Sequence, residues 1–220
     1  MLFCDREHAG RVLAGLLGDL EGRGCVVLAI PNGGVPVGIR IADELRADLG
    51  VVIVRKLQVP GNTEAGFGAV TSRGDTILNE ELVPHLGLDG ETIKRIADRT
   101  LDEVRRRHKE FGVADIDIRG RTVILVDDGL ASGFTMIAAV RSVRGRGPKR
   151  VIVAVPTASA RAVTLVASEA DRFVCPDVKD GPSFAVAEAY EDWYDLTIRE
   201  ASAMLQAWLR KQRPKKDPLE

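Results

Sequence analysis

Two adjacent carboxylates, Asp127 and Asp128, directly follow an apolar run and precede a short loop of small residues. The whole segment, from Val123 to Met136, is VILVDDGLASGFTM. Its apolar part predicts a buried strand, and the amphipathic segment after the loop predicts a helix. The backbone N–H groups of Ala131 to Thr135 would then lie at the helix N-terminus, where unpaired donors and the helix dipole favour a phosphate. We therefore expect an anion site in this segment.

The loop residues have individual roles in this interpretation. Gly133 allows a ligand to approach the backbone closely, Ser132 and Thr135 add hydroxyl donors, and Thr135 is also a candidate helix cap. Adjacent carboxylates are costly to bury unless they accept hydrogen bonds, which the vicinal hydroxyls of a ribose would donate. The alternative is that the Asp pair only caps the helix and the glycines only serve the turn. The length of the matching pattern favours the site.

A second strand–loop–helix pattern, AIPNGGVPVG, runs from Ala29 to Gly38. Its adjacent Gly33 and Gly34 let the backbone fold sharply and turn its N–H groups toward one point, which suits a second anion; a plain strand-to-helix turn is the alternative. Arg55 and Lys56 end a further apolar run. Ligands of open α/β sheets bind at the carboxyl ends of the strands, so we expect these cations beside both loops. Solvated strand-end charges are the competing interpretation.

Apolar runs alternate with helix-period segments along the chain, which is the pattern of a parallel twisted sheet flanked by helices. We expect one α/β domain over residues 1–220. The runs that predict strands are Val26–Ile30, Val51–Arg55, Thr122–Val126, Arg150–Val155 and Arg172–Cys175. The residues that share helical faces are Ile93, Ala97, Leu101 and Val104, and then Met136, Ala139, Val140 and Val143.

Two segments interrupt the alternation. The glycine-bearing segment 57–79 predicts a mobile loop or a small hairpin. The segment 176–195 is rich in turn residues and aromatic side chains, and it predicts a small C-terminal hood beside the sheet. The tail from Arg210 has no periodic apolar residues, so we expect it to be frayed.

The composition is that of an ordinary soluble protein, with 45% apolar and 29% charged residues. A formal net charge of −1 provides no global positive field, so neither nucleic acid nor an acidic membrane is an expected partner. No apolar run is long enough to cross a bilayer and no leader pattern begins the chain, so we expect a cytoplasmic location. The three cysteines are in no metal-site spacing, and we expect free thiols.

The segment around Asp127 and Asp128 resembles the phosphoribosyl-pyrophosphate motif of the type I phosphoribosyltransferases. The resemblance implies that the Asp pair contacts the ribose 2′- and 3′-hydroxyls, and that the loop from Ala131 through Ser132, Gly133 and Phe134 to Thr135 holds the 5′-phosphate. Ala131 resembles the adenine and uracil enzymes, because enzymes acting on 6-oxopurines have an Asp there.

Other segments extend this resemblance. The Gly33–Gly34 turn matches the pyrophosphate loop, with Asn32 at a position where a cation is common. Arg55 and Lys56 are similar to the pair that precedes the catalytic flexible loop in the adenine and orotate enzymes. Segment 176–195 occupies the place of the hood that receives the acceptor, where Tyr190 or Trp193 would stack on a planar ring.

The implied activity is transfer of phosphoribosyl from 5-phosphoribosyl-1-pyrophosphate (PRPP) to a nucleobase-like acceptor, with release of pyrophosphate. The resemblance further implies Mg²⁺ bound mainly through PRPP without dedicated protein ligands, a homodimer, and a place in nucleotide salvage. A non-catalytic PRPP-binding regulator of the same fold is the alternative. A phosphoacceptor site as in receiver domains is a further alternative, but such domains carry their acidic pair after the first strand.

Overall fold

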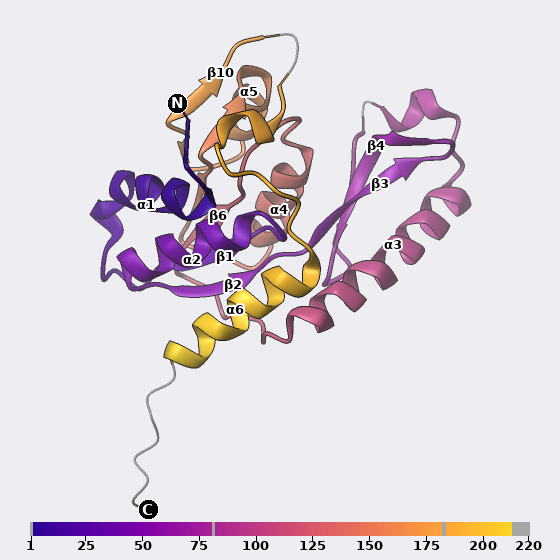
Figure 1. Cartoon of the computed structure of the whole chain (residues 1–220). Coiled ribbons are helices and arrows are strands. Elements are labelled where there is room, and N and C mark those ends of the chain that lie inside the picture. Colours follow the sequence, from indigo (N-terminus) through magenta and orange to yellow (C-terminus); the bar gives the residue numbers. More distant parts are fainter. Residues whose placement is uncertain (1, 81, 182–183, 213–220) are drawn as a thin grey trace, which may run out of the picture.

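A five-stranded sheet forms the centre of the computed structural model, which describes residues 2–80, 82–181 and 184–212. The strand order is β2-β1-β6-β7-β9, and every pairing is parallel. The bounds are β1 Val26–Ala29, β2 Asp48–Val51, β6 Thr122–Val126, β7 Arg150–Ala154 and β9 Arg172–Val174. Figure 1 shows helices on both faces of this sheet. The expected α/β class, a parallel sheet flanked by helices, is confirmed.

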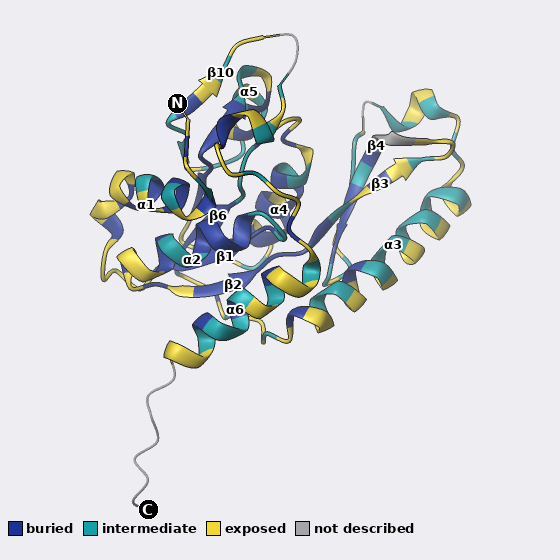
Figure 2. Ribbon diagram, viewed as in Figure 1, coloured by how far each residue is buried: buried dark blue, intermediate teal, exposed yellow. Residues whose placement is uncertain are grey.

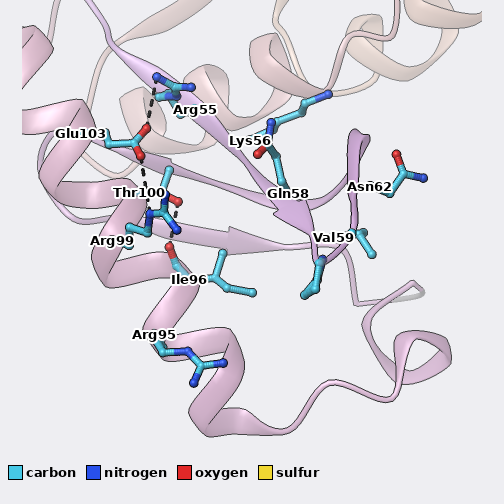
Figure 3. A pocket seen from close by; sticks show the side chains of 12 residues that line it. Arg55, Lys56, Gln58, Val59, Asn62, Arg95, Ile96, Arg99, Thr100 and Glu103 are labelled. Carbon is cyan, nitrogen blue, oxygen red and sulfur yellow. Dashed lines mark hydrogen bonds and ion pairs between the residues drawn. The ribbon is translucent and has the colours of Figure 1, made fainter.

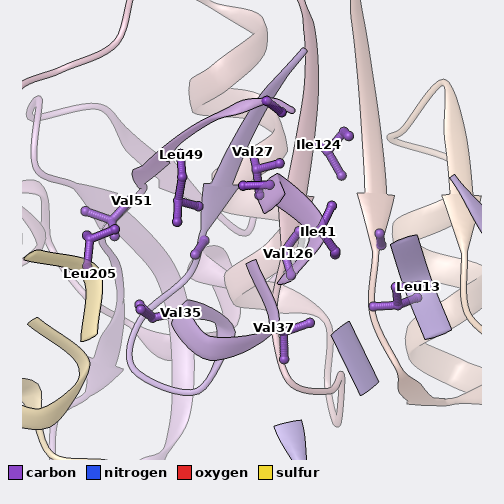
Figure 4. Close-up of a cluster of buried hydrophobic side chains, with 14 of the residues drawn as sticks. Leu13, Val27, Val35, Val37, Ile41, Leu49, Val51, Ile124, Val126 and Leu205 are labelled. Atoms are coloured by element: carbon purple, nitrogen blue, oxygen red, sulfur yellow. The ribbon is translucent and has the colours of Figure 1, made fainter. Parts of the chain in front are cut away.

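Alternate residues of the central strands point to opposite faces of the sheet and enter two separate cores. Val27 and Ile124 lie in the core under α1 (Arg6–Leu16), α2 (Gly34–Leu45) and α6 (Ile198–Gln212), part of which is drawn in Figure 4. Val26 and Val123 lie in the core under α4 (Phe134–Arg144) and α5 (Ala160–Ala167). β1 is buried along its whole length, and β2, β6 and β7 are buried after their first residues (Figure 2), which explains why their sequences lack polar alternation.

A second, antiparallel sheet extends from the central body beside a long helix (Figure 1). It consists of β3 (Val54–Val59), β4 (Asn62–Thr71) and β5 (Thr76–Leu78), and the helix is α3 (Gly90–Phe111), preceded by the short turn η2 (Val83–Leu86). Of the two structures expected for segment 57–79, the hairpin agrees with this arrangement.

The expected strand Val51–Arg55 is wrong in its bounds. The chain leaves the parallel sheet after β2, and β3 of the antiparallel sheet begins at Val54. One Val-rich run therefore contributes to two sheets, because its first residue, Val51, pairs with β1 whereas its last residue, Arg55, pairs with β4. Hydrophobicity alone does not distinguish the two partners.

The segment expected to form the hood contains β10 (Asp177–Lys179) and the turn η3 (Val186–Ala189), and Pro182 and Ser183 lie outside the described residues. β10 pairs with β8 (Thr157–Ser159) next to α5. The N-terminal segment joins this region through a bridge between Phe3 and Tyr190. After α1 comes the short turn η1 (Gly18–Leu20). The frayed tail expected from Arg210 is wrong for its first residues, because α6 continues to Gln212; residues 213–220 lie outside the description.

Candidate functional site

Asp127 and Asp128 lie directly after β6, at the carboxyl edge of the central sheet. Asp127 Oδ1 accepts the backbone N–H of Asp128 at 2.9 Å. Burial, and next the negative charge of Asp128, raise the pKa of the Asp127 carboxyl well above its ordinary value. Asp127 therefore lies in an environment that favours a proton or an incoming hydrogen-bond donor.

Arg6 is the partner of Asp128, and the sequence did not reveal it. Its Nε donates to Asp128 Oδ2 at 2.8 Å, and the two side chains are only 6% and 15% exposed. The same guanidinium donates to the carbonyl of Tyr194 at 3.0 Å and lies 3.9 Å from the ring centroid of Trp193. Arg6 is the first residue of α1, 122 positions from Asp128, so no local pattern connects them. It joins α1, the hood and the carboxylate pair.

The two aromatic residues expected to stack on an acceptor, Tyr190 and Trp193, pack against each other and contact Asp128 and its partner Arg6, respectively. Tyr190 is 5% exposed, and its hydroxyl donates to the Asp128 carbonyl at 2.6 Å. Its ring lies 5.8 Å from that of Phe3 and 5.3 Å from that of Trp193, centroid to centroid. Burial raises the pKa of Tyr190, which keeps the hydroxyl a donor. In this structure Tyr190 supports Asp128, and Arg6 covers the Trp193 ring.

The turn after β1 packs directly against the Asp pair. A Cβ atom at Gly33 would lie 1.8 Å from Asp128 Oδ2, and one at Gly34 would lie 2.7 Å from the Val126 carbonyl oxygen. Only glycine fits both positions without displacing the carboxylate or the strand. The turn includes a cis peptide bond between Pro31 and Asn32. The two segments singled out from the sequence are therefore adjacent in space.

Asn32 is hydrogen-bonded to the segment that precedes α6. Its Nδ2 donates to the carbonyl of Leu196 at 2.8 Å. Its Oδ1 is buried and has no hydrogen-bond partner within the part of the chain that is described. Asn32 thus ties the turn after β1 to the segment that leads into α6.

The loop from Ala131 to Thr135 ends at the N-terminus of α4. Gly133 is the residue before the helix, with φ of 79°, a left-handed conformation that favours glycine. The expected capping by Thr135 is wrong, because α4 already begins at Phe134 and Thr135 lies inside its first turn. Ala131, Ser132 and Phe134 are exposed, so the loop is accessible to a ligand.

Arg55 and Lys56 lie in β3 of the hairpin, whereas we expected them at the end of a strand of the central sheet. Arg55 Nη1 lies 3.3 Å from Glu103 Oε2 on α3. Lys56 extends from the other face of the strand, away from α3 (Figure 3). The pleat therefore separates the two cations, and the Arg55 side chain is turned toward α3 rather than grouped with Lys56.

Fold and site together define an α/β protein with a carboxylate pair and a helix N-terminus at the carboxyl edge of a parallel sheet. The family model of the phosphoribosyl transferase domain matches residues 6–193, and the chain belongs to that family. The family membership expected from the motif is confirmed.

Three relatives illustrate the extent of the similarity. The crystal structure of TT1426 from Thermus thermophilus superposes with a TM-score of 0.82 at 37% identity, covering 94% of this chain and 99% of that one. A Mycobacterium tuberculosis H37Rv protein, provisionally named a phosphoribosyl transferase, is 38% identical over 206 residues, which are 93% of this chain and 46% of its own length. A ribose-phosphate pyrophosphokinase of Sulfolobus acidocaldarius is 31% identical over 114 residues, covering 52% of this chain and 35% of its own length. The chain thus spans about half the length of the curated relatives it matches most fully.

Neither a metal-binding cluster nor a membrane-spanning helix is present among the residues that the structure describes. No set of three or more His, Cys, Asp or Glu side chains is placed there to hold a metal ion. None of the helices in residues 2–80, 82–181 and 184–212 combines the length and apolar character that a membrane span requires. The cysteines Cys4, Cys25 and Cys175 are free, as expected.

Proposed function

We propose that this protein transfers the phosphoribosyl group of PRPP to a nucleobase-like acceptor, with release of pyrophosphate. The observation that carries the proposal is the contact between the Gly33 turn and Asp128, directly beside the loop that leads into α4. It brings a carboxylate pair, a glycine turn and a helix N-terminus to one edge of the sheet. An activated sugar with a phosphate at one end and a pyrophosphate at the other needs these three features.

The sugar would be held through its hydroxyls and its 5′-phosphate. Asp128 Oδ2 is occupied by Arg6 and Asp127 Oδ1 by a backbone N–H, so each carboxylate keeps one oxygen that can accept from a ribose hydroxyl. The backbone N–H groups at the start of α4 would hold the 5′-phosphate, with Ser132 adding a hydroxyl.

The leaving pyrophosphate would lie against the Gly33–Gly34 turn. We assign its cationic contact to Lys56 rather than Arg55, because Arg55 is turned to Glu103 on α3. Val54, which shares the strand face of Lys56, packs in the same core as Met136 of α4. This supports the inference that Lys56 lies on the side of the hairpin that faces the phosphate loop, so that closure of the hairpin would bring it over the leaving group.

Magnesium fits this donor set when it is bound through the substrate. The site offers the two carboxylates of Asp127 and Asp128, and Mg²⁺ typically retains waters and substrate oxygens with one or two protein carboxylates. When bound, it would neutralise the negative charge that develops on pyrophosphate.

The proposal is tested by mixing the full chain, PRPP and Mg²⁺ with adenine, uracil, orotate, xanthine or guanine singly, and measuring pyrophosphate. We expect release with one acceptor class. Asp128→Asn should lower kcat/KM by about 10- to 150-fold, the effect of losing one hydrogen bond to a charged group. The matched control is Asp98→Asn, which makes the same change at an exposed position of α3.

Three outcomes are informative. Equal activity of wild type and Asp128→Asn would contradict the assigned role. Binding of PRPP without release for any acceptor would favour the regulatory alternative. If calorimetry detected no PRPP binding, both the proposed transfer activity and the regulatory alternative would be contradicted.

A further inference from the structure

A second charged cavity lies outside the carboxylate site, between the β3–β4 hairpin and α3 (Figure 3). Its volume is about 560 Å³, within the range of about 300–1,000 Å³ that is usual for small-molecule sites. Neither Asp127 nor Asp128 lines it. Lys56, which the proposed reaction uses, is one of the lining residues, but that reaction gives no role to the wall formed by α3.

One wall of the cavity is a stripe of charged residues on α3. Arg95, Arg99 and Glu103 follow one another at intervals of four residues, so they lie on the same face of the helix. Arg55 faces them from β3 across the cavity. The cavity thus has three guanidinium groups, two on α3 and one on β3, around a single carboxylate.

Glu103 forms ion pairs with two of the three arginines, but its single negative charge does not neutralise all three. Its Oε2 lies 3.3 Å from Arg55 Nη1, and its Oε1 lies 3.9 Å from Arg99 Nε. Arg95 has no ion pair within the described parts of the chain. The next step of the stripe is Arg107, whose pKa is lowered by burial and then by repulsion from Arg55. Arg55, Arg95, Arg99 and Glu103 together therefore keep an excess of about two positive charges.

The remaining lining residues indicate the chemical character of the ligand. Val59, Pro60 and Ile96 supply apolar surface, and Asn62 and Gln58 add amide groups. The guanidinium fork matches phosphate oxygens in pairs. A ligand that suits both walls carries at least two negative charges and a flat or apolar moiety.

We propose that this cavity binds a nucleoside diphosphate or triphosphate, at a site separate from the one at Asp127 and Asp128. The phosphates lie along Arg95, Arg99 and Arg55, and the base lies against Val59 and Ile96. Because the cavity is formed by the hairpin that carries Lys56, such a ligand would bias the position of that hairpin. Binding itself does not depend on the proposed transfer activity.

The test is calorimetric titration of the full chain with ATP in EDTA, so that no divalent metal contributes. We expect saturable binding of one ATP per chain. The double variant R95A/R99A should weaken binding by at least about 10-fold, the effect of losing one charge-assisted hydrogen bond. Arg99 is 85% exposed and Arg95 is also exposed, so the fold should be unaffected and circular dichroism should be unchanged.

Two control variants test whether ATP binds at this cavity rather than through the general charge of α3 or at the Asp pair. R105A/R106A removes the same charge from exposed positions of α3 that do not line the cavity, and it should change the ATP affinity less than twofold. D127N/D128N should bind ATP as wild type does. Pyrophosphate release by R95A/R99A, with no ATP present, should equal that of wild type.

Several results would overturn the proposal. They are no saturable ATP binding by wild type, an equal loss in R105A/R106A, and loss of ATP binding in D127N/D128N. A wild-type dimer in sedimentation that R95A/R99A dissociates, together with absent ATP binding, would assign the cavity to a second copy of the chain.

Discussion

Replacing Arg6 with alanine removes the cation that pairs with Asp128 inside the protein. The Arg6 side chain is 6% exposed and that of Asp128 is 15% exposed, so water cannot readily replace the lost partner. The substitution also removes the donor to the Tyr194 carbonyl and the cation over the Trp193 ring. Among the described residues, no other cation then forms an ion pair with the Asp128 carboxylate, which lies beside Asp127.

The expected loss follows from the burial of the pair. Removing one partner of a buried ion pair costs about 3–5 kcal/mol, mostly because the remaining charge is uncompensated. For a protein of this size about 1 kcal/mol shifts the melting temperature by about 2–4 °C, so Arg6→Ala should melt roughly 6–20 °C below wild type. Part of the loss comes from the aromatic contact, which is worth about 0.5–2 kcal/mol.

A double-mutant cycle with Asp128→Asn separates the ion pair from the other contacts of Arg6. Thermal and urea unfolding of wild type, Arg6→Ala, Asp128→Asn and the double variant should give a coupling energy of at least about 1.5 kcal/mol. Arg11→Ala, an exposed arginine on the same helix, is the control and should stay within about 0.5 kcal/mol of wild type. A melting temperature for Arg6→Ala within about 2 °C of wild type, or a coupling energy near zero, would refute the reasoning.

Two further predictions concern the carboxylate pair. Because the pKa of Asp127 is raised in the folded protein, the folded state holds its proton more tightly than the unfolded chain, and stability falls as pH rises from the unfolded value through the folded one. Asp127→Asn should remove this pH dependence, and in urea unfolding at pH 7 it should be more stable than wild type. It should also lose activity. Unchanged stability at pH 7 would argue against a raised pKa of Asp127. Gly33→Ala places a methyl group 1.8 Å from Asp128 Oδ2 and should abolish PRPP binding in calorimetry with the fold retained, whereas Gly18→Ala, which meets no atom within 4 Å, should bind normally. Normal PRPP binding by Gly33→Ala would contradict the proposed contact.

Some features of the site were readable from short stretches of sequence. The strand, the Asp pair and the helix from Val123 to Met136 formed as predicted, because hydrophobic periodicity and a small-residue loop are local signals. The turn at Gly33 and Gly34 was found for the same reason. Parallel pairing of β1 with β6 then brought both turns to one edge of the sheet.

Other features depended on which segments meet in three dimensions. The Val-rich run after Gly50 divides between two sheets, and only the pairing partners decide where β2 ends and β3 begins. The pleat of β3 then turns Arg55 toward α3 and Lys56 away from it, although the two are neighbours in the chain.

The sequence by itself determined the fold class and the Asp127–Asp128 motif, because the motif is a local pattern and the fold class follows from the order of locally recognisable strands and helices. The tertiary structure alone decided that Arg6 neutralises Asp128, that Tyr190 supports it from behind, and that α3 and the hairpin enclose a cavity with an excess of arginines. These contacts join residues that are remote along the chain, and their energies depend on burial, which exists only after the chain has packed.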